Sequence, residues 1–149
     1  MLRRVEFACA SLLLGAVVLL VGLAAITRAT GAPIIWSIEV AQLIFLWLCI
    51  LAIDLGLQDE RHFGLRIVQD NVSPGVSKVV EIVNLLIMVA LLAFLIRYAW
   101  RNTVIMHTRL DGALQIPGSY YHASMVVGFA LMIRTLLARL VNTFFRKDA

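Results

Sequence analysis

The sequence predicts an all-α integral membrane protein, with four transmembrane helices and a short amphipathic interfacial helix between the second and third spans. Of its 149 residues, 62% are apolar and 15% are charged, and the mean hydropathy is +0.94. A water-soluble domain needs far more polar surface than this composition provides. The apolar residues also lie in four runs, each near the roughly 20 residues that a helix needs to cross a bilayer. No internal repeat divides the chain, so residues 1–149 are expected to form a single membrane domain.

The first predicted span covers about 7–27. It carries no charged residue and is longer than the hydrophobic part of a secretory signal. Arg3 and Arg4 precede it as they would in a signal, but its length favours a membrane helix that stays in the protein.

The second predicted span covers about 34–57, with a charge-free centre between Glu39 and Asp54. Trp36 and Trp47 lie at helical spacing with these two acids, which places all four on one broad stripe. Such a stripe more often packs against other helices than binds a ligand. The four residues are therefore candidates for helix pairing or for an interface.

A short amphipathic helix is expected at about 59–72. Phe63, Ile67 and Val68 fall on one helical face, and charged residues occupy much of the other. This pattern is typical of a helix that lies in the cytoplasmic membrane interface. A solvated loop with incidental apolar residues is the alternative.

Prolines mark the starts of the last two helices. Ser73-Pro74 has the pattern of an N-cap followed by a first helical residue, and the membrane part of this third helix covers about 79–98. If the helix continues to about residue 107, it is on the order of 45–50 Å long and its far end protrudes into water. The fourth span covers about 119–140, after the breaker Pro117-Gly118, and ends in a basic amphipathic tail.

The distribution of cations predicts that both termini lie in the cytoplasm. With the termini inside, the inner side holds eight Lys and Arg residues and the outer side holds four, and cytoplasmic loops carry the excess of cations. The inner cations are Arg3, Arg4, Arg61, Arg66, Lys78, Arg139, Arg146 and Lys147, and the outer cations are Arg28, Arg97, Arg101 and Arg109.

The few ionisable side chains inside the spans are expected to pair in two layers. Asp54, Glu81 and Arg134 lie at the inner level in this orientation, whereas Glu39 and Arg97 lie at the outer level. An ion pair in a dry helix bundle keeps helices in register, because separating the partners leaves a charge unpaired in low dielectric. The alternative is that each side chain snorkels to its own headgroup region.

The sequence shows no motif for catalysis or for a cofactor. His62, His107 and His122 are scattered over three segments, and the two cysteines lie at unrelated positions inside apolar runs. This spacing suits neither a metal site nor a redox pair, and no nucleophile elbow or glycine-rich phosphate loop occurs. The cations flank apolar runs and form no basic stripe, which argues against a nucleic-acid partner. We therefore expect a chain that is not an enzyme and binds no cofactor or metal itself.

Two stretches resemble a known family. One runs from Trp36 to Trp47 (WSIEVAQLIFLW) and continues to Arg61-His62-Phe63-Gly64. The other runs from Leu110 to Tyr121 (LDGALQIPGSYY) and is followed by Val127-Gly128. Together they resemble the small membrane subunit of the tripartite ATP-independent periplasmic (TRAP) transporters, over about residues 33–135.

The resemblance implies a non-transporting scaffold in the bacterial inner membrane. In that family a large membrane subunit binds substrate and sodium and carries out the transport movement, and a periplasmic binding protein delivers the substrate. The implied partners are therefore these two proteins and the lipid bilayer, with sodium held in the large subunit. The transported solute would be an organic acid such as a C4-dicarboxylate, a sugar acid or sialic acid. The resemblance places Trp36 and Glu39 at the start of the second span and His62 in the turn after it, with structural or interface roles.

A charged group on the predicted periplasmic side is a candidate docking surface for the binding protein. Exposed charges at the rim of an interface steer encounter more than they hold the complex together. The docking candidates are Arg28, Arg101, His107, Arg109 and Asp111.

Two other functions stay open at this point. A stand-alone small multidrug-type exporter also has four spans, but it needs an ionisable residue deep in the membrane for proton exchange, and the acids here lie off-centre. A membrane anchor subunit of another complex is the third candidate. Transport by the purified chain would favour the exporter, and copurification with redox proteins would favour the anchor.

Overall fold

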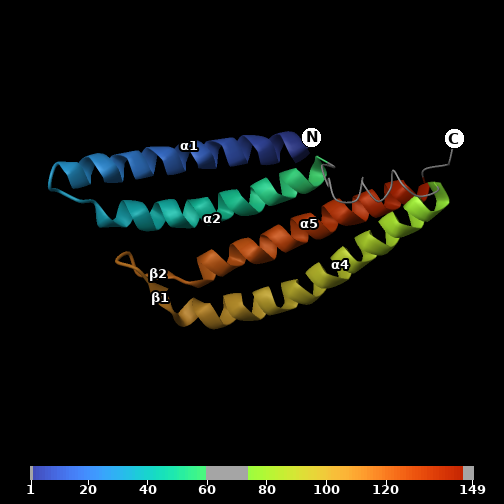
Figure 1. Cartoon of the computed structure of the whole chain (residues 1–149). Helices are drawn as coiled ribbons and strands as arrows, with labels where there is room; N and C mark the ends of the chain where they lie inside the picture. The colour runs from blue at the N-terminus through green and yellow to red at the C-terminus, as the bar shows by residue number, and fades with distance from the viewer. Residues whose placement is uncertain (1, 60–73, 146–149) are drawn as a thin grey trace.

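The computed structural model describes residues 2–59 and 74–145. This part contains four long helices, α1 (Leu2–Ala29), α2 (Ile35–Gln58), α4 (Pro74–Ile105) and α5 (Ser119–Phe145) (Figure 1). Each is long and apolar enough to cross a membrane, which confirms the four predicted membrane helices. The interfacial helix predicted at about 59–72, with His62, falls outside the described residues except for Asp59.

The helix ends follow from local sequence. Gly31 has a positive φ of 79°, which a residue without a Cβ adopts at little cost. The amides of Gly31 and Ala32 bond back to carbonyls of the last turn of α1 and close that helix. Pro74 is the first residue of α4, where its missing N–H costs no hydrogen bond.

The third helix is long, as the sequence predicts. α4 has 32 residues and continues directly into a 3-10 turn, η1 (Met106–Thr108). At about 1.5 Å per residue it measures roughly 48 Å, against about 30 Å of hydrocarbon. α4 is therefore longer than the apolar layer, and its C-terminal end leads into the connection to α5.

This connection is a small β-hairpin that the sequence analysis did not predict. β1 (Leu110–Asp111) pairs antiparallel with β2 (Ile116–Pro117), with Asp111 opposite Ile116. Gly112, with a φ of +74°, opens the turn between the strands. Strands of two residues are too short for an alternating pattern, so the dipeptide Asp111-Gly112 is the one local signal of a hairpin.

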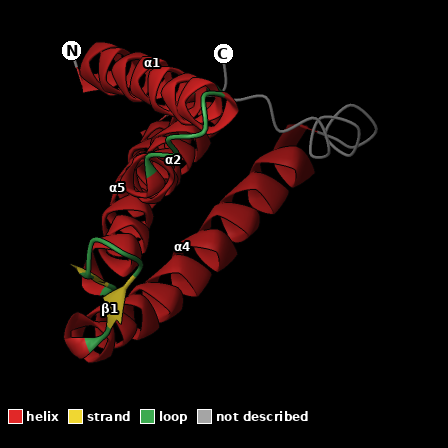
Figure 2. Cartoon of the chain, turned by 90° about the vertical axis from the view of Figure 1, so that its left-hand side faces the viewer, coloured by secondary structure: helices red, strands yellow, loops and turns green. Residues whose placement is uncertain are grey.

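The four helices pack as an open row in the order α1, α2, α5, α4. Figures 1 and 2 show α1 and α4 on the outside and the parallel helices α2 and α5 between them. Consistently, α2 and α5 bury a larger share of their residues than α1 and α4 do. Along the helix axes, the start of α1 and the end of α5 lie at one end of the molecule, which we call the termini end. The hairpin lies at the opposite end, which we call the hairpin end (Figure 1).

Two contacts hold the row together at its centre. Gly128 of α5 lies directly against Ile50 of α2, so that a Cβ at Gly128 would overlap the Ile50 side chain. An apolar cluster joins α2, α4 and α5. Its buried members are Leu57, Leu85, Met132 and Leu136.

The described helices therefore form an open row and do not close into a four-helix bundle. α5 lies between α2 and α4, and large apolar side chains stay exposed along both outer helices, for example Leu19 on α1 and Ile87 on α4. Water would penalise such surfaces, but lipid is as apolar as these side chains and gives no hydrophobic drive to close the bundle. An open row is stable where lipid or a partner covers its faces.

Candidate functional site

A group of polar side chains joins α1, α2 and α5 near the termini end. We call this group the polar cluster, and it consists of Glu6, Asp54, Gln58, Arg134 and Thr135. Glu6 is 6% exposed and Asp54 is 0% exposed, although both lie in helices apolar enough to cross a membrane. Arg134 lies between them, with Nη1 at 3.2 Å from Oε1 of Glu6 and Nη2 at 3.8 Å from Oδ2 of Asp54.

Every carboxylate oxygen in the polar cluster has a partner. Gln58 Nε2 donates to Oε2 of Glu6 at 2.5 Å and to Oδ2 of Asp54 at 2.8 Å. Thr135 donates its hydroxyl to Oδ1 of Asp54 at 2.9 Å. Buried carboxylates are tolerated when they are paired and hydrogen-bonded in this way. The acids thus hold three helices together and present no vacant oxygen to a solute.

The structure brings together only part of the predicted inner layer. Asp54 and Arg134 meet, but Glu81 of α4 instead accepts a hydrogen bond from Thr143 at 3.4 Å. Thr143 lies nine residues beyond Arg134 on α5, about 13 Å along the helix axis. Glu81 therefore lies at a different level from Arg134, and the prediction that it joins this layer is wrong.

Glu6 was missed in the sequence analysis. It stands before the charge-free run of the first span and looks like a residue of the membrane surface. α1 nevertheless begins at Leu2, so Glu6 already faces α2 and α5 from within the helix. The signal that would have indicated it is an acid in the first turns of an otherwise apolar helix.

A second polar contact, which we call the hairpin clasp, ties α2 to the connection between α4 and α5. The carboxylate of Glu39 accepts the amide of Ala113 at 2.6 Å on Oε1 and the amide of Leu114 at 3.0 Å on Oε2. Two successive backbone amides that converge on one carboxylate form a concave anion site of the kind called a nest. Hydrogen bonds to an ionised acceptor are stronger than neutral ones.

Only glycine fits at position 112 of the hairpin clasp. Its φ of +74° disfavours any side chain, and a Cβ there would lie 2.6 Å and 2.7 Å from the two oxygens of Glu39. The hairpin backbone can therefore approach the carboxylate closely because Gly112 has no side chain.

The hairpin clasp replaces the predicted outer pair. Arg97 is exposed on α4 and, within residues 2–59 and 74–145, forms no ion pair with Glu39 or another acid. The pairing of Glu39 with Arg97 is therefore wrong. The reason is the helix order, because α5 separates α2 from α4 while the hairpin lies beside the start of α2 (Figure 1).

The docking candidates lie toward the hairpin end. Arg28 is exposed in the last turn of α1, and Arg101 is exposed near the end of α4. His107 Nδ1 lies 3.0 Å from Oγ of Ser119, while Arg109 pairs with Asp111 at 3.1 Å. Of these residues, Arg28 and Arg101 present their charge most freely.

The two tryptophans of the second span differ in environment. Trp36 is 46% exposed at the start of α2, whereas Trp47 is half-buried in the middle of the helix. Indole rings commonly anchor at the membrane boundary, which suits the place of Trp36 in the chain.

Weakening the hairpin clasp is expected to loosen the hairpin. In the variant Glu39→Gln, one oxygen that accepts an amide becomes an NH2 group, and the negative charge is lost. Amide hydrogen exchange at Ala113 and Leu114 is expected to accelerate several-fold. The control Arg109→Gln removes the exposed pair with Asp111 and should leave both amides protected. Unchanged protection in Glu39→Gln would show that the carboxylate does not hold the hairpin.

Within the described ranges 2–59 and 74–145, no group of three or more His, Cys, Asp or Glu is arranged to hold a metal ion.

A family model described as tripartite ATP-independent periplasmic transporters, DctQ component, matches residues 17–146. None of the curated proteins compared with the chain matches it. The matched range covers all of α2, α4 and the hairpin, with both halves of the hairpin clasp. It also covers Asp54 and Arg134 of the polar cluster, but it starts after Glu6.

Proposed function

Since this chain belongs to the DctQ component family of tripartite ATP-independent periplasmic transporters, we propose that it is the small, non-transporting scaffold subunit of such a transporter. The observation that carries the proposal is that the buried acids are fully hydrogen-bonded within the chain. All four carboxylate oxygens of Glu6 and Asp54 are occupied by side chains of the chain itself. A carrier needs ionisable groups that are free to bind and release a proton or a solute.

The scaffold acts beside two other proteins in this proposal. A large membrane subunit binds the solute together with sodium and performs the transport movement. A periplasmic binding protein delivers the solute, an organic acid such as a C4-dicarboxylate, a sugar acid or sialic acid. The complex lies in the bacterial inner membrane, with both termini of this chain in the cytoplasm. The two ends of the molecule then face opposite sides of the membrane, with the hairpin end in the periplasm.

Reconstitution in liposomes tests the proposed function. The chain alone should give no solute flux, and the chain with the large subunit and the loaded binding protein should give sodium-dependent uptake. The large subunit should also copurify with the chain from native membranes. Proton-coupled export by the chain alone, or copurification with redox proteins in place of a large transporter subunit, would overturn the proposal.

The cations at the hairpin end are proposed to steer the binding protein. Replacing Arg28 or Arg101 by Glu is expected to lower uptake by up to roughly tenfold when the binding protein is limiting, because surface charge mainly changes the association rate. Arg109→Glu should have a smaller effect, since Arg109 is already paired with Asp111.

Two controls accompany this measurement. Arg4→Glu changes an exposed cation at the termini end and should leave uptake unchanged. High salt should reduce the difference between Arg28→Glu and the parent protein, because salt screens exposed charges. Equal uptake by all the hairpin-end variants at limiting binding protein would remove the docking proposal.

A further inference from the structure

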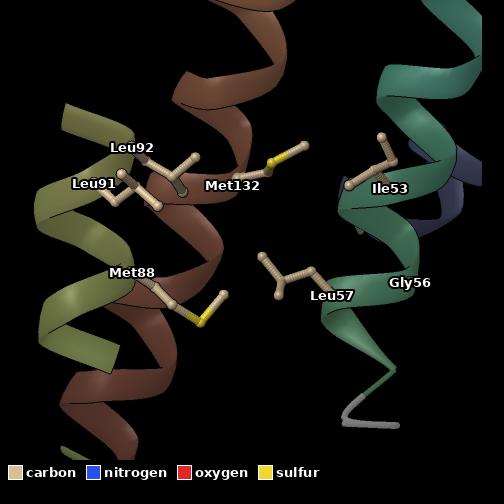
Figure 3. Close-up of a pocket in the computed structure, with 7 residues that line it drawn as sticks. All are labelled: Ile53, Gly56, Leu57, Met88, Leu91, Leu92 and Met132. Carbon is tan, nitrogen blue, oxygen red and sulfur yellow. The ribbon is translucent and has the colours of Figure 1, made fainter. Parts of the chain in front are cut away.

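An apolar groove runs between α2 and α4 over the surface of α5. It has a volume of about 350 Å³. Figure 3 shows the α2 side chains on one wall, the α4 side chains on the other, and Met132 of α5 between them. The groove is lined by Ile53, Gly56, Leu57, Met88, Leu91, Leu92 and Met132.

The groove follows from the open row. Because α5 separates α2 from α4, these two helices rise on either side of it and no helix of the described part fills the space between them. Its lining is apolar and comes from helices that are long and apolar enough to cross a membrane, so lipid tails and other membrane helices are the two candidate occupants. Two features decide between these occupants.

The first feature is the amide of Asn84. It lies on α4 one turn before Met88, and its Nδ2 donates to the Met88 sulfur at 3.7 Å. A thioether is a weak acceptor, and an amide has two N–H donors and a carbonyl oxygen to satisfy. Among the described residues, no stronger side-chain partner is present for Asn84. A lipid tail offers none, whereas a neighbouring helix with a polar side chain does.

The second feature is the bare backbone at Gly56. A Cβ built at this position meets no atom of the described residues within 4 Å, so nothing in that part of the chain requires the glycine for packing. Small residues on a membrane helix allow another helix to approach closely. Gly56 therefore offers one wall of the groove as a place of close helix contact.

We propose that this groove seats one transmembrane helix of a partner membrane subunit. That helix is apolar, places a small residue against Gly56 and carries a hydrogen-bonding side chain at the level of Asn84. The inference rests on the proposed function, in which the partner is the large subunit. It goes further by assigning the contact face to α2, α4 and α5.

Filling the groove tests the inference. Gly56→Leu adds a side chain to one wall of the groove, and Gly22→Leu makes the same change on α1; at both positions a Cβ meets no atom of the described residues within 4 Å. Recovery of the large subunit with the purified chain should fall by roughly tenfold in Gly56→Leu, because an overpacked contact is strongly weakened. It should not change in Gly22→Leu. Circular dichroism should show both variants fully helical.

Crosslinking identifies the occupant. A photoreactive residue at Leu91, which is 56% exposed at the groove, should capture the large subunit in native membranes. The same residue at Leu86, which is 49% exposed, points about 140° away around α4 and should capture little of it. Capture of lipid alone, or of a second copy of this chain, from Leu91 would overturn the inference.

The failures of the two proposals are distinguishable. If the parent chain recovers the large subunit and Gly56→Leu recovers it equally well, the groove is not the seat and the proposed function stands. If the parent chain recovers no large subunit at all, the proposed function fails and the inference fails with it.

Discussion

Replacing Arg134 by leucine is expected to be among the most damaging single changes in the chain. The variant leaves the carboxylates of Glu6 and Asp54 buried side by side without a cation. Breaking a buried pair costs roughly 3–5 kcal/mol, and because the Arg134 side chain is 40% exposed we expect about 2–3 kcal/mol here. The free energy of unfolding, measured by denaturant titration in detergent micelles, should fall by this amount.

A rescue experiment separates the charge effect from a packing effect. Adding Glu6→Gln and Asp54→Asn to Arg134→Leu removes the uncompensated charge and should restore part of the lost stability. The control Arg97→Leu removes an exposed cation that has no ion pair in the described ranges and should change stability little. Parent-like stability of Arg134→Leu would mean that the polar cluster does not hold α1, α2 and α5.

Replacing Gly128 by leucine is expected to force apart the two central helices. A Cβ at this position already overlaps Cγ2 of Ile50 and lies 2.9 Å from its Cδ1. Overpacking of a tight contact costs roughly 1–3 kcal/mol, occasionally more. The effect should be at the upper end, because α2 and α5 are the contact between the two halves of the row. The thermal midpoint in detergent and the yield of monodisperse protein should both drop.

The compensating change is on the facing helix. Ile50→Ala makes room for the new side chain, so the double variant with Gly128→Leu should recover much of the lost stability. Gly15→Leu on α1 makes the same substitution where a Cβ meets no atom of the described residues within 4 Å, and should behave as the parent does. A Gly128→Leu protein as stable as the parent would show that α2 and α5 can separate at no cost.

These contacts fix α2 to α5 at three levels. The hairpin clasp acts at the hairpin end, Gly128 meets Ile50 in the middle, and Thr135 bonds Asp54 toward the termini end. α4, by contrast, packs on α5 mainly through apolar side chains, with the bond from Thr143 to Glu81 at its termini end. A pair of helices clamped along its length suits the proposed scaffold, because a partner helix can then bind a surface of constant shape.

The sequence by itself determined the number, type and approximate extent of the helices. Apolar runs of membrane length, Pro74 at a helix start and Pro117-Gly118 as a breaker are local signals, and each acts through neighbours within one turn. The length of α4 was predictable for the same reason. The family resemblance rested on two stretches of the chain and agrees with the family match.

Only the tertiary structure decided which helices are neighbours and which polar groups meet. Glu39 bonds a hairpin backbone 74 residues away, and Glu6 meets Arg134 across 128 residues. The physical reason is that a membrane helix is apolar on nearly all sides, so hydropathy does not show which face meets protein and which meets lipid. That choice depends on shape, as at Gly128, and on the position of a few polar atoms in three dimensions.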